Sequence, residues 1–221
     1  MPRTGQIRLS GSMHPPYFVI DDFFSPTEYA MLKGRVLEQE WQFVPTVAGE
    51  IFVENGVHEV DNSSFGQIWY MRGKPEKTRN EDLFPILKYK LNELFEVDEV
   101  YRIRCGMHIP VGHRKVNDPH VDMVEPHWTA LMYFSTEKDA GHTYLYDEYY
   151  DPCMYPDTAV QVKGRELKVL DKVAPQENRI VFFRGDMYHA GSAPEKILRR
   201  CVMNVNFLGW PRHVQSPNPN K

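Results

Sequence analysis

Helical spacing of apolar residues marks two segments in the first half of the chain. The first segment, 26–39, repeats them on one face, at Tyr29, Leu32, Val36 and Leu37. Ser25 precedes it as a candidate N-cap, Pro26 suits the first helical position, and Glu28 lies three residues after Ser25. This combination is typical of a capping box. We therefore predict an amphipathic helix there.

A second helix is predicted from Asn80 onward. Its apolar positions again recur every three to four residues, at Leu83, Leu87, Leu91 and Leu94. Two short runs rich in β-branched and aromatic residues, 17–20 and 65–71, are predicted to be strands instead, because turn residues border them.

The pattern changes to a period of two after Val97. In the segment 100–108 the apolar positions share one side of the predicted strand, whereas Arg102 and Arg104 share the other. Further strands are predicted at 128–134, 142–146, 178–183, 187–189 and 200–208. Residues 147–166 are rich in Tyr and Pro, so we predict a long surface loop there.

Two helices followed by about seven or eight short strands indicate an α+β protein, in which the helices pack on one face of a β-sandwich or jelly roll. We expect a flexible lead-in at 1–16, a single domain at 17–210 and a polar tail at 211–221. Within the domain, 17–96 would form a helical support region and 97–210 the β core.

Composition excludes several classes of function. The net charge of −4 shows no basic excess of the kind that nucleic-acid binding requires. No apolar run reaches the ~18 residues of a membrane helix, and the first residues lack a signal-peptide pattern. Cys105, Cys153 and Cys201 are too few and too widely spaced for a disulfide framework. These features indicate a cytoplasmic protein.

Candidate chemistry centres on the stretch Asp118-Pro119-His120-Val121-Asp122. Residues two apart on an extended strand point to one face, so His120 and Asp122 project into the same space. His189, on a distant predicted strand, would complete a set of two histidines and one carboxylate. Non-heme Fe(II) oxygenases use that ligand set and leave adjacent metal positions open.

The order of these residues resembles the Fe(II)/2-oxoglutarate-dependent dioxygenases, and within them the prolyl 4-hydroxylase-like group. His189 lies 67 positions after Asp122 (189 − 122), and Arg199 and Arg200 follow it by ten and eleven. Segments 129–135 and 178–183 are similar to strands that flank the metal site in that group. The resemblance covers residues 97–210 well and 17–95 more loosely; Ala140 stands where a glycine is usual.

The resemblance implies a double-stranded β-helix, cupin-like, and a role for each residue. His120, Asp122 and His189 would hold Fe(II), and 2-oxoglutarate would chelate the metal through its 2-oxo acid end. Its distal carboxylate would bind an arginine, whose planar fork matches a carboxylate, with help from Tyr133. O2 would take the last metal position, and ascorbate would serve as reductant.

Strand parity leaves two choices for that arginine. If Arg200 points inward, Val202, Asn204 and Asn206 share its face; if Arg199 does, the inward set is apolar and begins with Cys201. The resemblance favours Arg200, because the group often has a polar residue four positions after its basic one, and Asn204 fits. Arg199 stays as the alternative.

Other polar residues have plainer interpretations. His108, His113, His127 and His142 lack the ligand layout, although His127 and His142 are candidates for the mouth of the pocket. Arg102 and Arg104 are interpreted as solvated or paired strand residues, one of which could contact an acidic substrate.

The leading hypothesis is a hydroxylase that acts on an unactivated C–H bond and converts 2-oxoglutarate to succinate and CO2. Halogenating relatives usually replace the metal-binding carboxylate with a small residue, and Asp122 is retained here. The substrate would be a prolyl or other peptidyl residue, an amino acid or another small molecule. The alternatives are a cupin-type metalloenzyme that does not use 2-oxoglutarate and a catalytically silent, metal-binding jelly roll that serves as an interaction module.

Overall fold

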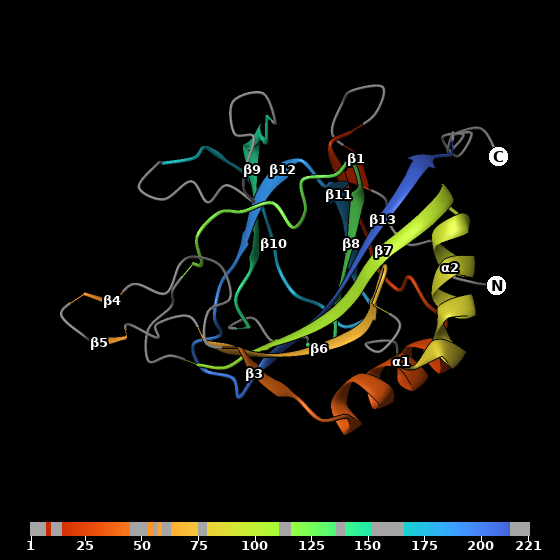
Figure 1. Cartoon of the computed structure of the whole chain (residues 1–221), viewed down its shortest axis with the longest axis horizontal. Coiled ribbons are helices and arrows are strands. Elements are labelled where there is room, and N and C mark those ends of the chain that lie inside the picture. The colour runs from red at the N-terminus through yellow and green to blue at the C-terminus, as the bar shows by residue number, and fades with distance from the viewer. Residues whose placement is uncertain are drawn as a thin grey trace.

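The computed structural model describes residues 8–9, 15–44, 53–54, 57–58, 63–74, 79–110, 116–135, 140–151 and 166–212. Two sheets and two α-helices form most of this part of the chain (Figure 1). His113 and Cys153 lie outside the described residues.

The large sheet has eight antiparallel strands in the order β1–β2–β11–β8–β13–β7–β6–β3. In that order their bounds are Arg8–Leu9, Tyr17–Ile20, Ile180–Arg184, Trp128–Tyr133, Arg200–Pro211, Phe95–His108, Ser64–Met71 and Gln42–Val44. The central pair, β13 and β7, contains the two longest strands of the sheet and runs diagonally across the view in Figure 1.

A second, three-stranded sheet faces the large one, in the order β10 (Val169–Val173), β9 (Thr143–Tyr149) and β12 (Met187–Gly191). All its pairs are antiparallel. A separate hairpin joins β4 (Val53–Glu54) and β5 (Val57–His58). Two opposed antiparallel sheets with helices on one side agree with the predicted α+β jelly roll.

The helices cover the outer face of the large sheet (Figure 1). The capping box of α1 (Pro26–Glu38) is formed, because Glu28 N donates to Ser25 Oγ and Ser25 N donates to the Glu28 carboxylate. Buried side chains of α1 and α2 pack with the outward side chains of β7 and β13 in one core: Leu32, Val36, Leu87, Leu91, Ile103, Cys105, Met203, Val205 and Phe207. The two buried cysteines are not joined by a disulfide.

The second helix differs from the prediction at both ends. A 3-10 turn (Glu81–Leu83) replaces its expected first turn, and α2 runs from Phe84 to Asn92, so Leu94 lies beyond it. Pro85 explains the start: a proline lacks the N–H that a helix interior requires, whereas the first turn of a helix tolerates it.

The predicted loop at 147–166 is wrong at its beginning, because β9 continues to Tyr149 and pairs there with Met187 of β12. Residues 152–165 lie outside the described part. Strand β10 was not predicted, since this edge strand is largely exposed and lacks apolar alternation. In the expected lead-in, Arg8–Leu9 pairs with β2 as β1.

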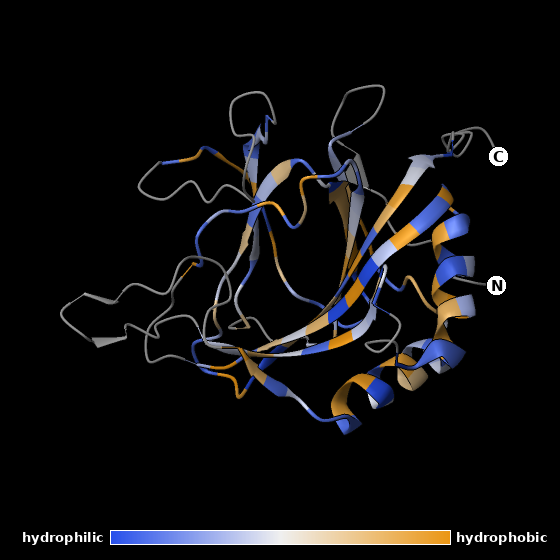
Figure 2. Ribbon diagram, viewed as in Figure 1, coloured by the Kyte–Doolittle hydropathy of each residue, from blue (hydrophilic) through white to orange (hydrophobic). Residues whose placement is uncertain are grey.

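Apolar and polar residues alternate along β7 and β13 (Figure 2), and this alternation places opposite chemistries on the two faces of the large sheet. Apolar residues point toward the helices, while Arg104 and Asn204 face each other across the two strands on the inner side. A smaller apolar cluster, which includes Leu131, Leu145 and Phe183, fills the space between the sheets. None of the helices in the described ranges is both long and apolar enough for a membrane span.

Candidate metal centre and pocket

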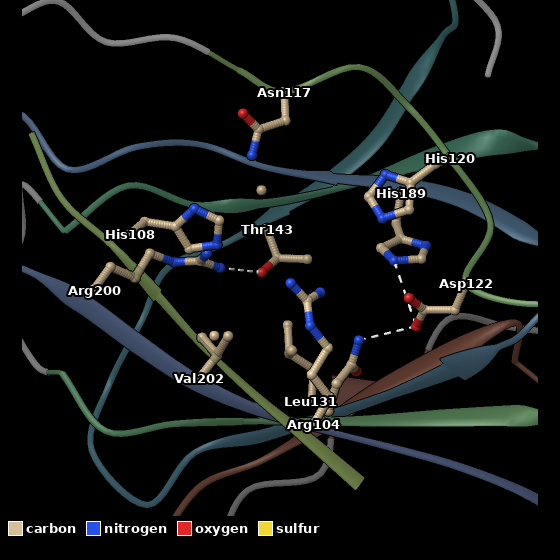
Figure 3. A pocket seen from close by; sticks show the side chains of 13 residues that line it. Arg104, His108, Asn117, His120, Asp122, Leu131, Thr143, His189, Arg200 and Val202 are labelled. Atoms are coloured by element: carbon tan, nitrogen blue, oxygen red, sulfur yellow. Dashed lines mark hydrogen bonds and ion pairs between the residues drawn. The ribbon is translucent and has the colours of Figure 1, made fainter. Parts of the chain in front are cut away.

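Three side chains converge at one end of the space between the sheets. His120 and His189 form an isolated antiparallel bridge, in which each backbone N–H donates to the other residue's carbonyl at 2.9 and 3.0 Å. Asp122 lies two residues after His120, and ligand atoms of all three residues lie within 4.8 Å of one another. The backbone bridge therefore holds both imidazoles beside a single carboxylate (Figure 3).

Backbone carbonyls orient both histidine rings. His120 Nδ1 lies 3.1 Å from the Asp118 carbonyl oxygen, and His189 Nδ1 lies 3.3 Å from that of Met187. A proton on Nδ1 in each ring satisfies these contacts and leaves Nε2 with a lone pair. In that tautomer His189 Nε2 faces Asp122, 3.9 Å from Oδ2.

The protonation states also suit a divalent metal. Burial raises the pKa of Asp122, but Arg102 and the two histidines outweigh that effect and hold it well below its usual range. Burial and the neighbouring His120 lower the pKa of His189 to about 4. At neutral pH His189 is therefore a neutral imidazole and Asp122 an ionised carboxylate, the forms that bind metal. Two histidines and one carboxylate with open positions fit Fe(II).

Three donors fix the Asp122 carboxylate. Arg102 Nη2 donates to Oδ1 at 2.8 Å, and Asn204 Nδ2 and Asn206 Nδ2 each donate to Oδ2 at 2.9 Å. Arg102 in turn donates from Nε to Asn206 Oδ1 at 2.9 Å. Asp122 therefore has its orientation set by β7 and β13 rather than by its own loop.

A buried arginine lies at the other side of the same pocket. Arg200 is 2% exposed, and its Nη2 donates to Thr143 Oγ1 at 2.7 Å. Tyr133 OH donates to the same Thr143 oxygen at 2.7 Å. Arg200 Nε is buried and has no hydrogen-bond partner among the described residues. The pocket thus contains a guanidinium whose donors are not all used.

The cavity between these groups has a volume of about 60 Å³. Inward residues of β7 form part of its wall: Arg104, Gly106 and His108. Burial, with the neighbouring Arg200 and Arg104, lowers the pKa of His108 to about 3, so its ring is neutral near pH 7. Leu131 and Val202 supply apolar wall.

The structure brings most of the candidate residues into this one pocket: His120, Asp122, His189, Arg200 and Asn204 line it, and Tyr133 joins it through Thr143. Asn204 contacts the Asp122 carboxylate rather than Arg200. Arg199 is exposed and lies in a different depression, beside Glu177 and Leu198.

Two histidines proposed for the pocket mouth do not line it. The His127 ring packs on Gly185, where an added Cβ would come within 2.4 Å of it. Sequence reasoning missed Thr143 and Asn117, which also line the pocket. It did not predict the contact between Arg102 and Asp122 either. The alternation in segment 100–108 could have indicated that Arg102 faces the pocket, since it placed both arginines on the side opposite the apolar residues.

No protein-family model and no curated protein matches this sequence. Solved structures do match. An oxidoreductase of the 2OG-Fe(II) oxygenase family from Burkholderia pseudomallei is 10% identical, with 87% of this chain and 84% of that chain covered and a TM-score of 0.56. A prolyl-4-hydroxylase from Pseudomonas putida is 14% identical, with 87% and 91% covered and a TM-score of 0.52.

A third match is the epimerase SnoN, solved in complex with Fe3+, alpha ketoglutarate and nogalamycin RO. It is 10% identical, with 93% of this chain and 89% of that chain covered and a TM-score of 0.56. At these identities the likeness is one of fold. The chain has the antiparallel jelly-roll fold of these 2OG-Fe(II) oxygenases, which confirms the predicted fold class.

Proposed function

We propose that the chain is an Fe(II)/2-oxoglutarate-dependent dioxygenase that hydroxylates a C–H bond of a small-molecule or peptide substrate. One observation carries the proposal: a cluster of two histidines and a carboxylate shares its cavity with a buried arginine that has no carboxylate partner among the described residues. A metal and a dianionic cosubstrate would satisfy both features together.

Arg200 is the stronger half of that argument. Burial lowers the pKa of Arg200, because removing a guanidinium from water disfavours its charged form. An unpaired buried charge destabilises a protein. The Nε of Arg200 also remains available as a hydrogen-bond donor. A ligand carboxylate would offset the cost through charge-assisted hydrogen bonds. The distal carboxylate of 2-oxoglutarate is the expected partner, with the Thr143 hydroxyl fixing the angle of the guanidinium.

Each group of the pocket would have a separate role in the reaction. Iron, when bound, supplies the activation of O2 that accompanies decarboxylation of the cosubstrate to succinate and CO2. His120, His189 and Asp122 would hold the metal, and Arg102 keeps Asp122 ionised. Leu131 and Val202 keep part of the wall free of water. Because Asp122 is present and held by three donors, oxygen transfer is favoured over halogen transfer.

The test is succinate formation by the full-length protein with Fe(II), ascorbate and 2-oxoglutarate, followed by a substrate library read for the gain of one oxygen. Arg200→Met should weaken binding of N-oxalylglycine, an analogue of the cosubstrate, by at least about tenfold, the scale of a lost hydrogen-bonded charge. Arg199→Met, which removes an exposed charge from the next residue, is the matched control and should bind it normally.

Two outcomes would contradict the proposal. Turnover that survives Arg200→Met would indicate a cupin-type metalloenzyme that does not use 2-oxoglutarate. Absence of succinate with every substrate tried would indicate a catalytically silent jelly roll.

A further inference from the structure

Arg104 is a second arginine of the pocket that the proposed chemistry leaves unused. It lies on the inner face of β7, between Arg102 and Gly106, and opposite Asn204 of β13. Its side chain lines the same cavity as the metal-binding cluster. Figure 3 shows its guanidinium pointing into the pocket.

The charge of Arg104 has no acidic partner among the described residues. The nearby carboxylate, Asp122, is taken by Arg102 on one oxygen and by Asn204 and Asn206 on the other. No hydrogen bond joins the Arg104 side chain to any described residue. Burial and the like charge of Arg102 lower the pKa of Arg104, and the charge of Asp122 offsets part of that effect. Arg104 is partly buried, so a charge without a hydrogen-bonded acid reduces the stability of the unliganded protein by less than a fully buried one would.

A charge count indicates what the site lacks. Arg102 and Asp122 neutralise each other. Bound Fe(II) would carry +2, Arg200 and Arg104 +1 each, and 2-oxoglutarate −2. The pocket would then keep a net charge of +2, which favours an anionic substrate.

Asn204 adds a second requirement. Its Nδ2 donates to Asp122, which turns its Oδ1 away from that carboxylate. This Oδ1 is buried and has no hydrogen-bond partner in the part of the chain that the structure describes. A buried acceptor without a hydrogen bond is costly and favours a ligand donor. Because Asn204 and Arg104 are register partners, one ligand can reach both.

We propose that Arg104 binds an oxyanion of the substrate, a carboxylate or phosphate, and that Asn204 accepts an N–H or O–H from the same molecule. The inference rests on the proposed function, and it narrows the substrate to anionic molecules. A neutral peptidyl proline without an acidic neighbour would leave the Arg104 charge unpaired.

The experiment measures inorganic phosphate binding to the full chain loaded with Mn(II), with and without saturating N-oxalylglycine. Paramagnetic relaxation of the phosphate ³¹P signal by Mn(II) reports binding close to the metal and gives a Kd. Arg104→Met should weaken phosphate binding at least about tenfold, and Arg104→Lys should restore part of it. Arg199→Met, which removes the same charge outside the pocket, should change the Kd less than about twofold.

Thermal unfolding separates a binding role from a structural one. Without ligand, Arg104→Met should melt a few degrees higher than the wild type, because it removes an unpaired charge from the pocket. A lower melting temperature would show that Arg104 stabilises the fold and would overturn the proposal. Phosphate binding that persists in Arg104→Met, or that is absent from the wild type, would also overturn it.

The N-oxalylglycine titration keeps this inference distinct from the proposed function. If Arg104→Met abolishes N-oxalylglycine binding, Arg104 belongs to the cosubstrate site and the inference fails while the function stands. If the wild type does not bind N-oxalylglycine, the proposed function fails, and the phosphate titration still decides whether Arg104 holds an oxyanion.

Discussion

At the scale of single residues, Asn206 links several groups of the proposed metal centre. Its side chain is fully buried, donates to Asp122 and to Thr129 Oγ1, and accepts from Arg102. It therefore orients both the carboxylate and the guanidinium that keeps this carboxylate ionised. Residues that orient metal ligands commonly change metal affinity by about 10–100-fold when they are replaced.

Asn206→Leu should weaken Mn(II) binding by about 10–100-fold, because the Asp122 carboxylate loses one donor and Arg102 loses its anchor. Calorimetric titration of the folded variant measures the change. Thr129→Val is the control, because it removes the hydrogen bond between Asn206 and Thr129 but leaves the bonds of Asn206 to Asp122 and Arg102. This variant should bind Mn(II) within about threefold of the wild type. Equal affinities for the two variants would contradict this role of Asn206.

At the scale of elements, the entry into β11 depends on an uncommon backbone conformation. Asn178 has a φ of 59°, in the left-handed region that asparagine tolerates better than most residues. Its side chain closes a pair of hydrogen bonds with the Phe24 backbone, donating to the carbonyl at 2.7 Å and accepting from the N–H at 2.9 Å. These bonds tie the start of β11 to the segment before α1.

Asn178→Ala should lower the free energy of unfolding by about 2–4 kcal/mol, because it removes two buried hydrogen bonds and places a Cβ-bearing residue without local hydrogen bonding in the left-handed region. Asn178→Gly loses the same bonds but tolerates the φ angle, so it should be about 1 kcal/mol more stable than the alanine variant. Urea unfolding measures both. If alanine and glycine proved equally stable, backbone conformation would not contribute.

At the scale of the whole molecule, a hydrogen bond joins the two sheets away from the pocket. Tyr17 of β2 donates to Asp171 of β10 at 2.9 Å, linking one end of the large sheet to the edge of the small one. Burial, with the adjacent carboxylate, raises the pKa of Tyr17 to about 12. The stabilisation that it gives is complete below pH 10 and is lost as the pH rises toward 12.

Tyr17→Phe should cost about 0.5–1 kcal/mol at pH 8, because the contact is half-exposed and its net hydrogen-bond energy is modest. The difference from the wild type should narrow above pH 10, where the unfolded wild type gains stability by ionising Tyr17. Urea titrations at pH 8, 10 and 11.5 measure the trend. A constant difference across that range would show that Tyr17 does not titrate as the contact with Asp171 requires.

Local pattern alone predicted much of this molecule. Helix α1 followed from its capping box and apolar face, and the strands from their alternation, because these signals are set by residues close in sequence. The ordered set of His120, Asp122, His189 and a following arginine came instead from the resemblance to a known family, because its members lie far apart in the sequence. The prediction was less accurate at α2, where Pro85 sets the start, and at β10, whose exposed edge gives no periodic signal.

Tertiary structure decided what adjacency in sequence could not. Parity put either Arg199 or Arg200 inward, and the pairing of β13 with both β7 and β8 fixed Arg200 in the pocket, since a shift of one residue reverses every side chain. The same pairing brought Asn204 and Asn206 to Asp122. It left Arg104 facing the cavity with no acidic partner among the described residues. The sequence by itself determined which groups were available for chemistry, because strand and helix periods are local properties. Only the long-range pairing of strands determined which charged side chains form ion pairs within the protein and which one, Arg104, is left for the proposed ligand.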